Sequence, residues 1–105
     1  MTAAAHIREA QERAMAVFRR RPETALSTVA AEATVGSGLT CTFVQGGHSA
    51  VMDMPATVGG SDEGPTPGFF ARAAIAGCVA IGIKMTAARL GIEVTSVRVG
   101  LEMDF

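Results

Sequence analysis

Two cysteines, Cys41 and Cys78, are the residues of this 105-residue chain with the most distinctive chemistry. A thiolate is a nucleophile and a metal ligand, so a cysteine can carry redox, acyl-transfer or metal chemistry. The two cysteines are far apart in the sequence, which excludes both a CxxC redox pair and the paired spacing of a zinc knuckle. Any chemistry at either thiol therefore depends on neighbours that the fold supplies.

Cys78 lies in the middle of a run without charge, from Ala73 to Ile83, which Arg72 and Lys84 bracket. One interpretation is a redox-active thiol in a water-poor pocket. The other is a small core residue, because free cysteine is among the most buried residue types. The spacing by itself favours core packing.

An ionised thiol at Cys78 would need a cation from elsewhere in the fold, because the effect of a helix N-terminus fades within its first turn. The candidates are Arg72 and the run Arg19, Arg20 and Arg21. Arg72 precedes the cysteine by six residues and falls on a different helical face. We therefore favour an arginine of the N-terminal segment or of a second subunit.

Cys41 alternates with Leu39 and Phe43 on one strand face, which indicates core packing. The sharper alternative is that Cys41 approaches Cys78 and resolves its oxidised form as a disulfide. The histidines, His6 and His48, are isolated, and no Cys/His/Asp cluster has metal-ligand spacing. We expect neither a metal nor a cofactor.

A long helix must position Cys78. Thr66 can accept a hydrogen bond from a first-turn amide, Pro67 suits the first helical position, and Gly91 suits the C-terminal stop. The uncharged run is too short to span a bilayer, which needs about 20 apolar residues. The sequence therefore predicts a buried central helix, wrapped by a sheet, that ends at Leu90.

The elements before this helix predict one α+β domain over residues 1–105. An amphipathic helix is expected at about 4–20. Three short alternating runs, at 25–35, 39–45 and 48–54, are separated by glycine turns and predict an antiparallel meander. The polar, glycine-rich loop at 56–65 is expected to be mobile.

Residues 92–105 alternate regularly between apolar and polar positions and predict one further strand. The pattern is still strong at Phe105, so we expect either that C-terminal sequence follows in the whole protein or that this strand pairs across a dimer. The apolar helix also predicts a homodimer, because one small sheet can cover it on one side only.

The composition bears on partners and location. The net charge of −1 gives no overall field for nucleic acid or anionic lipid, and the absence of Trp and Tyr removes the usual stacking platforms. We expect no nucleic-acid or membrane partner. The N-terminus lacks the apolar region of a signal peptide, and we expect a cytoplasmic protein with reduced thiols.

Several motifs together resemble the OsmC/Ohr family. They are Asp53-Met54-Pro55, the loop from Gly59-Gly60 to Pro65-Thr66-Pro67, the apolar helix to Cys78, and the Ala87–Ile92 and Val97–Val99 segments. The resemblance covers about residues 25–105, and the N-terminal helix resembles that of an OsmC-like subgroup. It implies an intertwined α+β homodimer with active sites at the subunit interface.

The resemblance also implies a function: reduction of organic hydroperoxides by two cysteines in oxidative-stress defence. The attacking cysteine of the family maps onto Cys78. The glutamate that supports it in the family maps onto position 68, where this chain has a glycine, Gly68. The second cysteine of the family belongs to a later helix, outside this sequence. The alternatives are a relative that binds a small apolar or thiol ligand at the dimer interface without catalysis, and a structural module.

Overall fold

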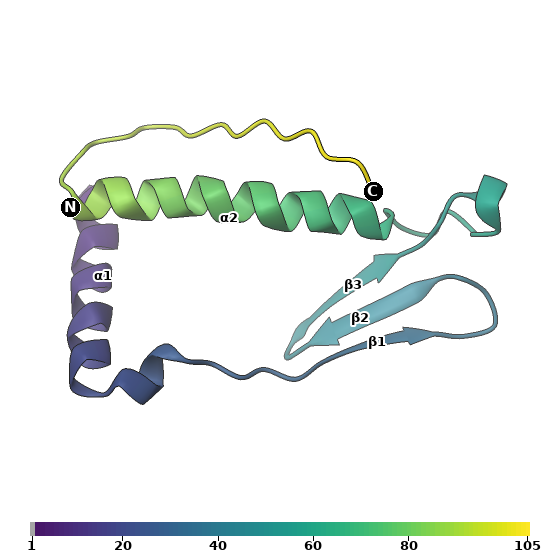
Figure 1. Cartoon of the computed structure of the whole chain (residues 1–105), viewed down its shortest axis with the longest axis horizontal. Helices are drawn as coiled ribbons and strands as arrows, with labels where there is room; N and C mark the ends of the chain where they lie inside the picture. The colour runs from purple at the N-terminus through teal and green to yellow at the C-terminus, as the bar shows by residue number, and fades with distance from the viewer. Residues whose placement is uncertain (1) are drawn as a thin grey trace. The chain divides into compact units, whose positions relative to one another are not determined.

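A computed structural model describes residues 2–105 as an α+β chain. Its elements are α1 (Ala3–Arg20), η1 (Pro22–Ala25), β1 (Ala31–Val35), β2 (Cys41–Gln45), β3 (His48–Met52), η2 (Ala56–Val58) and α2 (Pro67–Arg89) (Figure 1). The chain forms two compact units. Unit 1 holds the residues up to Ser27 with Ala74–Glu102, and unit 2 holds Thr28–Ala73 with Met103–Phe105.

Unit 2 contains the predicted meander, an antiparallel sheet of order β1-β2-β3. Cys41 pairs with Val35 on one side and Met52 on the other, so these side chains share a face. The two-residue turn between β2 and β3 starts at Gly46, whose φ of +59° is a left-handed conformation that suits glycine. The alternation read from the sequence is confirmed.

The first strand is shorter than the predicted 25–35. Pro22 starts a 3-10 turn that runs to Ala25, and pairing begins only at Ala31. The reason lies in β2, because Ala31 already pairs with Gln45, the last residue before the turn. No residue of β2 remains to pair with the segment at 26–30.

The loop after β3 is organised around the buried carboxylate of Asp53, whose exposed fraction is 2%. Its Oδ2 accepts from the Thr40 hydroxyl at 2.7 Å and the Glu63 amide at 3.2 Å. Its Oδ1 accepts from the amides of Met54 at 2.7 Å and Ser61 at 3.4 Å. These bonds join the loop to the end of the strand that it leaves, and the mobility that its composition indicates stays a prediction.

Two glycines allow the loop to fold so closely. A Cβ on Gly60 would lie 1.8 Å from the Met54 carbonyl oxygen, and one on Gly64 would lie 2.4 Å from the Val51 carbonyl oxygen. Both neighbours are backbone atoms, which cannot move aside without moving the strand end. The Gly59-Gly60 motif thus has a packing reason.

Helix α2 begins at Pro67, as predicted, and ends at Arg89, one residue before the predicted Leu90. The Phe69 amide donates to the Thr66 Oγ1 at 3.4 Å, which caps the first turn. At the other end Gly91 has a φ of +72°, its amide donates to Ala88, and the Ile92 amide donates to Ala87. This pair of bonds is a Schellman motif, which satisfies the last carbonyls.

The predicted burial of this helix is wrong for the single chain. Among the described residues only Ala87 and Ala88 are buried apolar side chains, and Ile81, near the middle of α2, is 62% exposed. Unit 1 holds most of α2, and within that unit only α1, η1 and the segment at 92–102 are available to cover it. By length and composition alone α2 could cross a membrane, but core helices of soluble proteins pass the same test.

In unit 1, the first half of α1 packs near the C-terminal end of α2. Ala4 and Ile7 lie with Ala87, Ala88 and Ile92 around one small hollow. Thr2 caps α1 by accepting from the Ala5 amide at 3.1 Å. The predicted amphipathic helix at about 4–20 is confirmed as Ala3–Arg20.

The predicted strand at 92–105 is not a strand in this chain. The segment is irregular in secondary structure and has no ladder partner among the described residues (Figure 1). A strand needs a neighbouring backbone for its amides and carbonyls. Here side chains of α2 take part of that role, since Lys84 donates to the Val94 carbonyl and Arg72 to the Met103 carbonyl.

Candidate functional site

Cys78 lies near the middle of α2, in unit 1, with a free thiol and an exposed residue surface. Both interpretations of the sequence placed it away from water, in a pocket or a core, and the single chain does neither. Its flanking positions include Ala74 and Gly77, which are small and leave open space beside the helix. The sulfur is thus accessible along an otherwise apolar helix.

Cys41 is half-buried on the apolar face of the sheet, in unit 2. Its cross-strand neighbours are Val35 and Met52. The thiol is free, and so is that of Cys78. The resolving role for Cys41 stays a prediction, whereas its place on a packing face follows from the register.

Gly68 occupies the first turn of α2, and its neighbours are an arginine and an aromatic ring. A Cβ at Gly68 would lie 3.0 Å from Arg72 Nη1 and 3.4 Å from a ring carbon of Phe105. The Arg72 guanidinium donates to the Met103 carbonyl from Nε at 3.0 Å and Nη2 at 2.7 Å. It also lies 4.7 Å from the centre of the Phe105 ring.

This arrangement bears on the substituted family position. A side chain at residue 68 would meet the guanidinium of Arg72 directly, so a carboxylate there would have a cation in reach. With glycine at this position, the guanidinium is instead bound to a backbone carbonyl and stacked on a ring. Sequence reasoning missed the contacts of Arg72, and the one available signal was its separation from Gly68 by one helical turn.

The other candidate arginines lie at the end of α1 in unit 1. Arg19 and Arg20 belong to the last turn of the helix, and Arg21 pairs with Glu23 at 3.3 Å. Between residues 2 and 105 no hydrogen bond or ion pair joins an arginine to Cys78. An arginine that activates the Cys78 thiol therefore stays a prediction.

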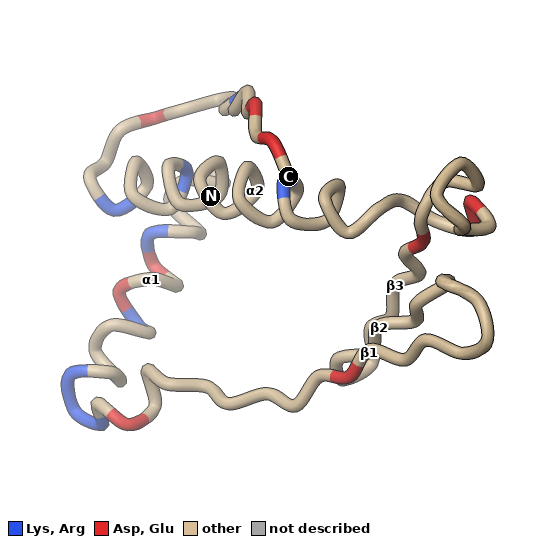
Figure 2. Tube along the Cα trace, turned by 45° about the vertical axis from the view of Figure 1, so that its right-hand side comes forward, with Lys and Arg blue, Asp and Glu red and all other residues tan. Residues whose placement is uncertain are grey.

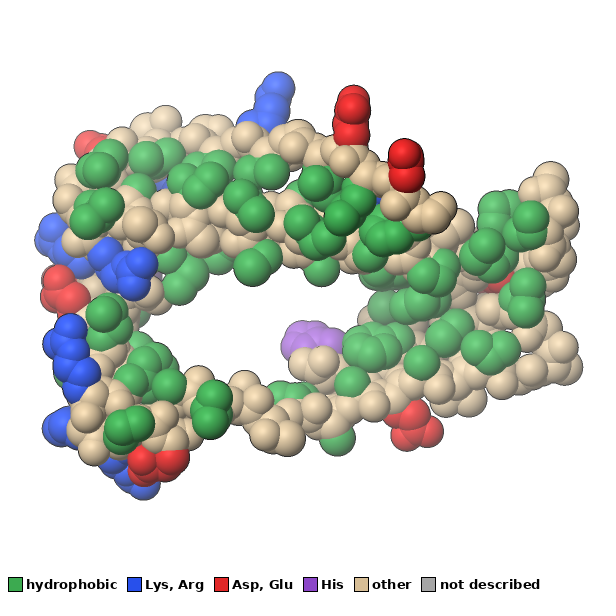
Figure 3. All heavy atoms as spheres, in the orientation of Figure 1, with side chains coloured by type: hydrophobic (Ala, Val, Ile, Leu, Met, Phe, Trp, Pro, Cys, Tyr) green, Lys and Arg blue, Asp and Glu red, His purple; other side chains and the backbone are tan. Residues whose placement is uncertain are grey.

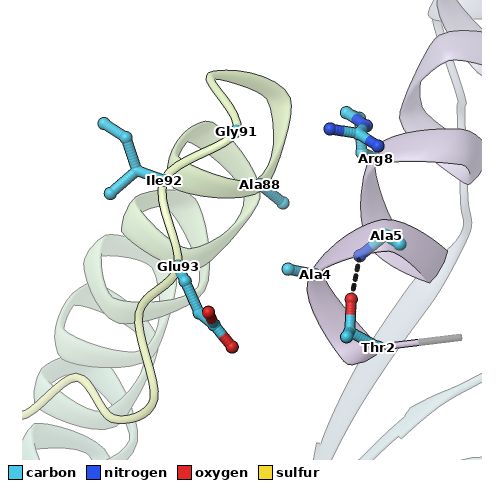
Figure 4. A pocket seen from close by; sticks show the side chains of 8 residues that line it. All are labelled: Thr2, Ala4, Ala5, Arg8, Ala88, Gly91, Ile92 and Glu93. Atoms are coloured by element: carbon cyan, nitrogen blue, oxygen red, sulfur yellow. Dashed lines mark hydrogen bonds between the residues drawn. The ribbon is translucent and has the colours of Figure 1, made fainter.

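Two hollows of unit 1 could accept small groups. The first has a volume of about 170 Å³ and lies between the start of α1 and the end of α2, where Arg8 and Glu93 are its charged residues (Figure 4). The second, of about 610 Å³, is an open apolar groove beside α2 that Ile7, Ile81 and Met85 help to line. Neither includes Cys78.

In the described part of the chain, no three His, Cys, Asp or Glu side chains gather where they could hold a metal ion. The most polar buried group is the Asp53 carboxylate. The hydrogen bond from the Thr40 hydroxyl, together with bonds from the Met54, Glu63 and Ser61 amides, holds its pKa below the ordinary value against the opposing effect of burial. This carboxylate is a structural anion.

Comparison with known proteins agrees with the motifs. Residues 60–105 match the family model described as OsmC-like protein. The matched segment contains the loop from Gly60 onward, all of α2 and the two positions Gly68 and Cys78. The resemblance predicted from the sequence is confirmed for this segment, consistent with a member of that family. No curated protein and no solved structure matches the chain.

Proposed function

We propose that this chain, OsmC-like by the match of residues 60–105, is a redox protein that reduces organic hydroperoxides through the thiol of Cys78. One observation supports this most directly. Cys78 is a free, accessible thiol on an apolar helix, inside the matched segment and at the position of the attacking cysteine in the resemblance. An apolar surface around a thiol suits an alkyl hydroperoxide better than hydrogen peroxide.

The atoms and electrons of the reaction balance with the Cys78 thiolate, the peroxide and a thiol reductant. The Cys78 thiolate attacks one oxygen of the O–O bond, an S–O bond forms, and the alkoxide leaves and takes up a proton to become the alcohol. Cys78 is then a sulfenic acid. A thiol reductant condenses with it and releases water, and a second thiol cleaves the mixed disulfide to restore Cys78.

The proposed assembly is a homodimer. Large apolar side chains are exposed along α2, among them Ile75, Val79, Ile81 and Ile83, and Figure 3 shows hydrophobic side chains spread over the visible face. Such a surface is unusual for a monomer. A second subunit would exclude water from Cys78 and could contribute the activating arginine. A folded monomer at micromolar concentration in sedimentation equilibrium would refute the proposed dimer.

The test is direct trapping of the sulfenic acid. Incubate the folded protein with cumene hydroperoxide and dimedone, and map the adduct by mass spectrometry. We expect modification of Cys78 ahead of Cys41, consumption of peroxide when dithiothreitol is present, and loss of both in Cys78→Ser. Cys41→Ser is the matched control, which keeps the adduct. A Cys78 that reacts only after unfolding sinks the peroxidase proposal.

A second function is favoured by the surroundings of Gly68. The family glutamate is absent, and the guanidinium of Arg72 is bound to the Met103 carbonyl. We propose as the alternative a non-catalytic relative that binds a small apolar or thiol ligand at the dimer interface. If the absent carboxylate silences the site, Gly68→Glu gains adduct formation at Cys78, and Gly68→Gln, which lacks the charge, does not. Equal rates of adduct formation at Cys78 in the wild type, Gly68→Glu and Gly68→Gln would show that the absent carboxylate does not explain inactivity.

A further inference from the structure

The arginines of α1 are unevenly distributed along the helix. The stretch 13–21 holds Arg13, Arg19, Arg20 and Arg21 and no acidic residue, whereas Glu9 and Glu12 lie before it and Glu23, which pairs with Arg21, follows it. Figure 2 shows the resulting blue cluster at the end of α1. We call residues 13–21 together with Leu26 the basic end of unit 1. A net charge of −1 for the whole chain conceals this local separation of charge.

The same end exposes apolar side chains. Phe18 is 39% exposed, Val17 is similarly open, and Leu26, just beyond η1, is 83% exposed. The contacts of α1 with α2 extend as far as Met15, whose sulfur lies 4.0 Å from an Arg89 nitrogen. Within unit 1, α1 and η1 are themselves in contact, so Leu26 belongs to the same end of the unit as Phe18.

Charge and apolar surface are interleaved around the helix. With 100° per residue, Ala14, Val17 and Phe18 form one stripe, Arg19 lies on one side of it, and Arg13 and Arg20 lie on the other. Arginine stems can lie along an apolar surface while their guanidinium groups reach outward to anions. This pattern is typical of helices that lie in a membrane interface.

We infer that the basic end of unit 1 docks on an anionic lipid surface, independently of the redox chemistry at Cys78. Phosphate and carboxylate headgroups complement Arg13, Arg19 and Arg20, whereas Arg21 is paired with Glu23 at 3.3 Å. The acyl boundary receives Phe18, Val17 and Leu26. A nucleic acid would use the arginines but not the aliphatic side chains, and the chain has no Trp or Tyr on which bases would stack. Lipid is therefore the partner that uses both features.

Vesicle flotation with the full chain tests this inference. Vesicles of phosphatidylcholine with about 30% phosphatidylserine are compared with pure phosphatidylcholine at low salt. We expect binding to the anionic vesicles only, with loss of binding at about 0.5 M NaCl, where the charges are screened. The double variant Arg19→Gln/Arg20→Gln is expected to bind roughly 20-fold more weakly.

Two further variants separate the possible partners. Phe18→Ser is expected to weaken vesicle binding roughly tenfold, because the apolar contact is lost. Arg8→Gln/Arg98→Gln removes the same charge outside the basic end and should bind as the wild type does. Binding to a single-stranded RNA without binding to vesicles overturns the inference. So does vesicle binding that survives the Arg19/Arg20 double variant, or no binding by the folded wild type.

Discussion

Replacement of Gly60 by alanine tests how the loop before α2 is built. The new Cβ would lie 1.8 Å from the Met54 carbonyl oxygen, and real Cβ contacts are not found under 3.0 Å. Backbone must therefore move by more than 1 Å. The Gly60 amide donates to the Pro55 carbonyl at 3.0 Å, and the next amide, of Ser61, donates to Asp53, so these bonds are strained by the same movement.

The magnitude follows from these two effects. Steric overpacking costs about 1–3 kcal/mol, and each weakened hydrogen bond adds roughly 1 kcal/mol. We expect Gly60→Ala to lower the free energy of unfolding by about 3 kcal/mol, a large share of the 5–15 kcal/mol typical of small domains. Gly47→Ala is the matched control in a turn, since nothing lies within 4 Å of its Cβ.

Urea unfolding followed by circular dichroism measures the loss, and hydrogen exchange locates it. The amides of Ser61 and Glu63, which donate to Asp53, should exchange faster in Gly60→Ala than in wild type, while those of α1 should not change. The packing account of the Gly59-Gly60 motif would be refuted if the free energy of unfolding of Gly60→Ala lay within about 0.5 kcal/mol of the wild-type value and its loop amides stayed protected from exchange.

Three smaller predictions concern the cap, the helix and the carboxylate. Thr66→Ala removes the side-chain acceptor of the Phe69 amide and should cost about 1 kcal/mol in urea unfolding, which Thr66→Ser should largely avoid. Gly77→Ala adds a Cβ into open space within α2 and should stabilise the protein by about 0.5–1 kcal/mol; a loss would indicate that this face is covered. The hydrogen bond from the Thr40 hydroxyl lowers the pKa of Asp53 in the folded protein. The Asp53 carboxylate therefore stabilises the fold at any pH above the ordinary aspartate pKa of ~3.9, and this stabilisation is lost as the pH falls through the lower pKa of the folded state. In Asp53→Asn the free energy of unfolding should therefore fall less between neutral and acidic pH than in the wild type. An equal fall in both proteins would contradict this role.

Local chemistry let the sequence by itself predict both helices and the meander. The limits of α2 follow from Thr66 and Gly91, whose capping preferences act within one helical turn. The meander follows from alternation with period two and from glycine turns, and the observed pairing of Cys41 with Met52 agrees with it. Cys78 could be named as the candidate nucleophile only through the resemblance of the motifs around it, because its position in an apolar run by itself favours core packing.

Tertiary structure decided what each element touches. An apolar helix predicts that something covers it, but not that the cover comes from the same chain, and α2 is largely exposed here. The alternating segment at 92–105 lacks a ladder partner, because pairing depends on a neighbouring strand that periodicity cannot supply. Only the folded chain brings the Arg72 guanidinium beside Gly68 and Phe105, or the Asp53 carboxylate under the amides of the loop, since these contacts depend on the path of the backbone through space.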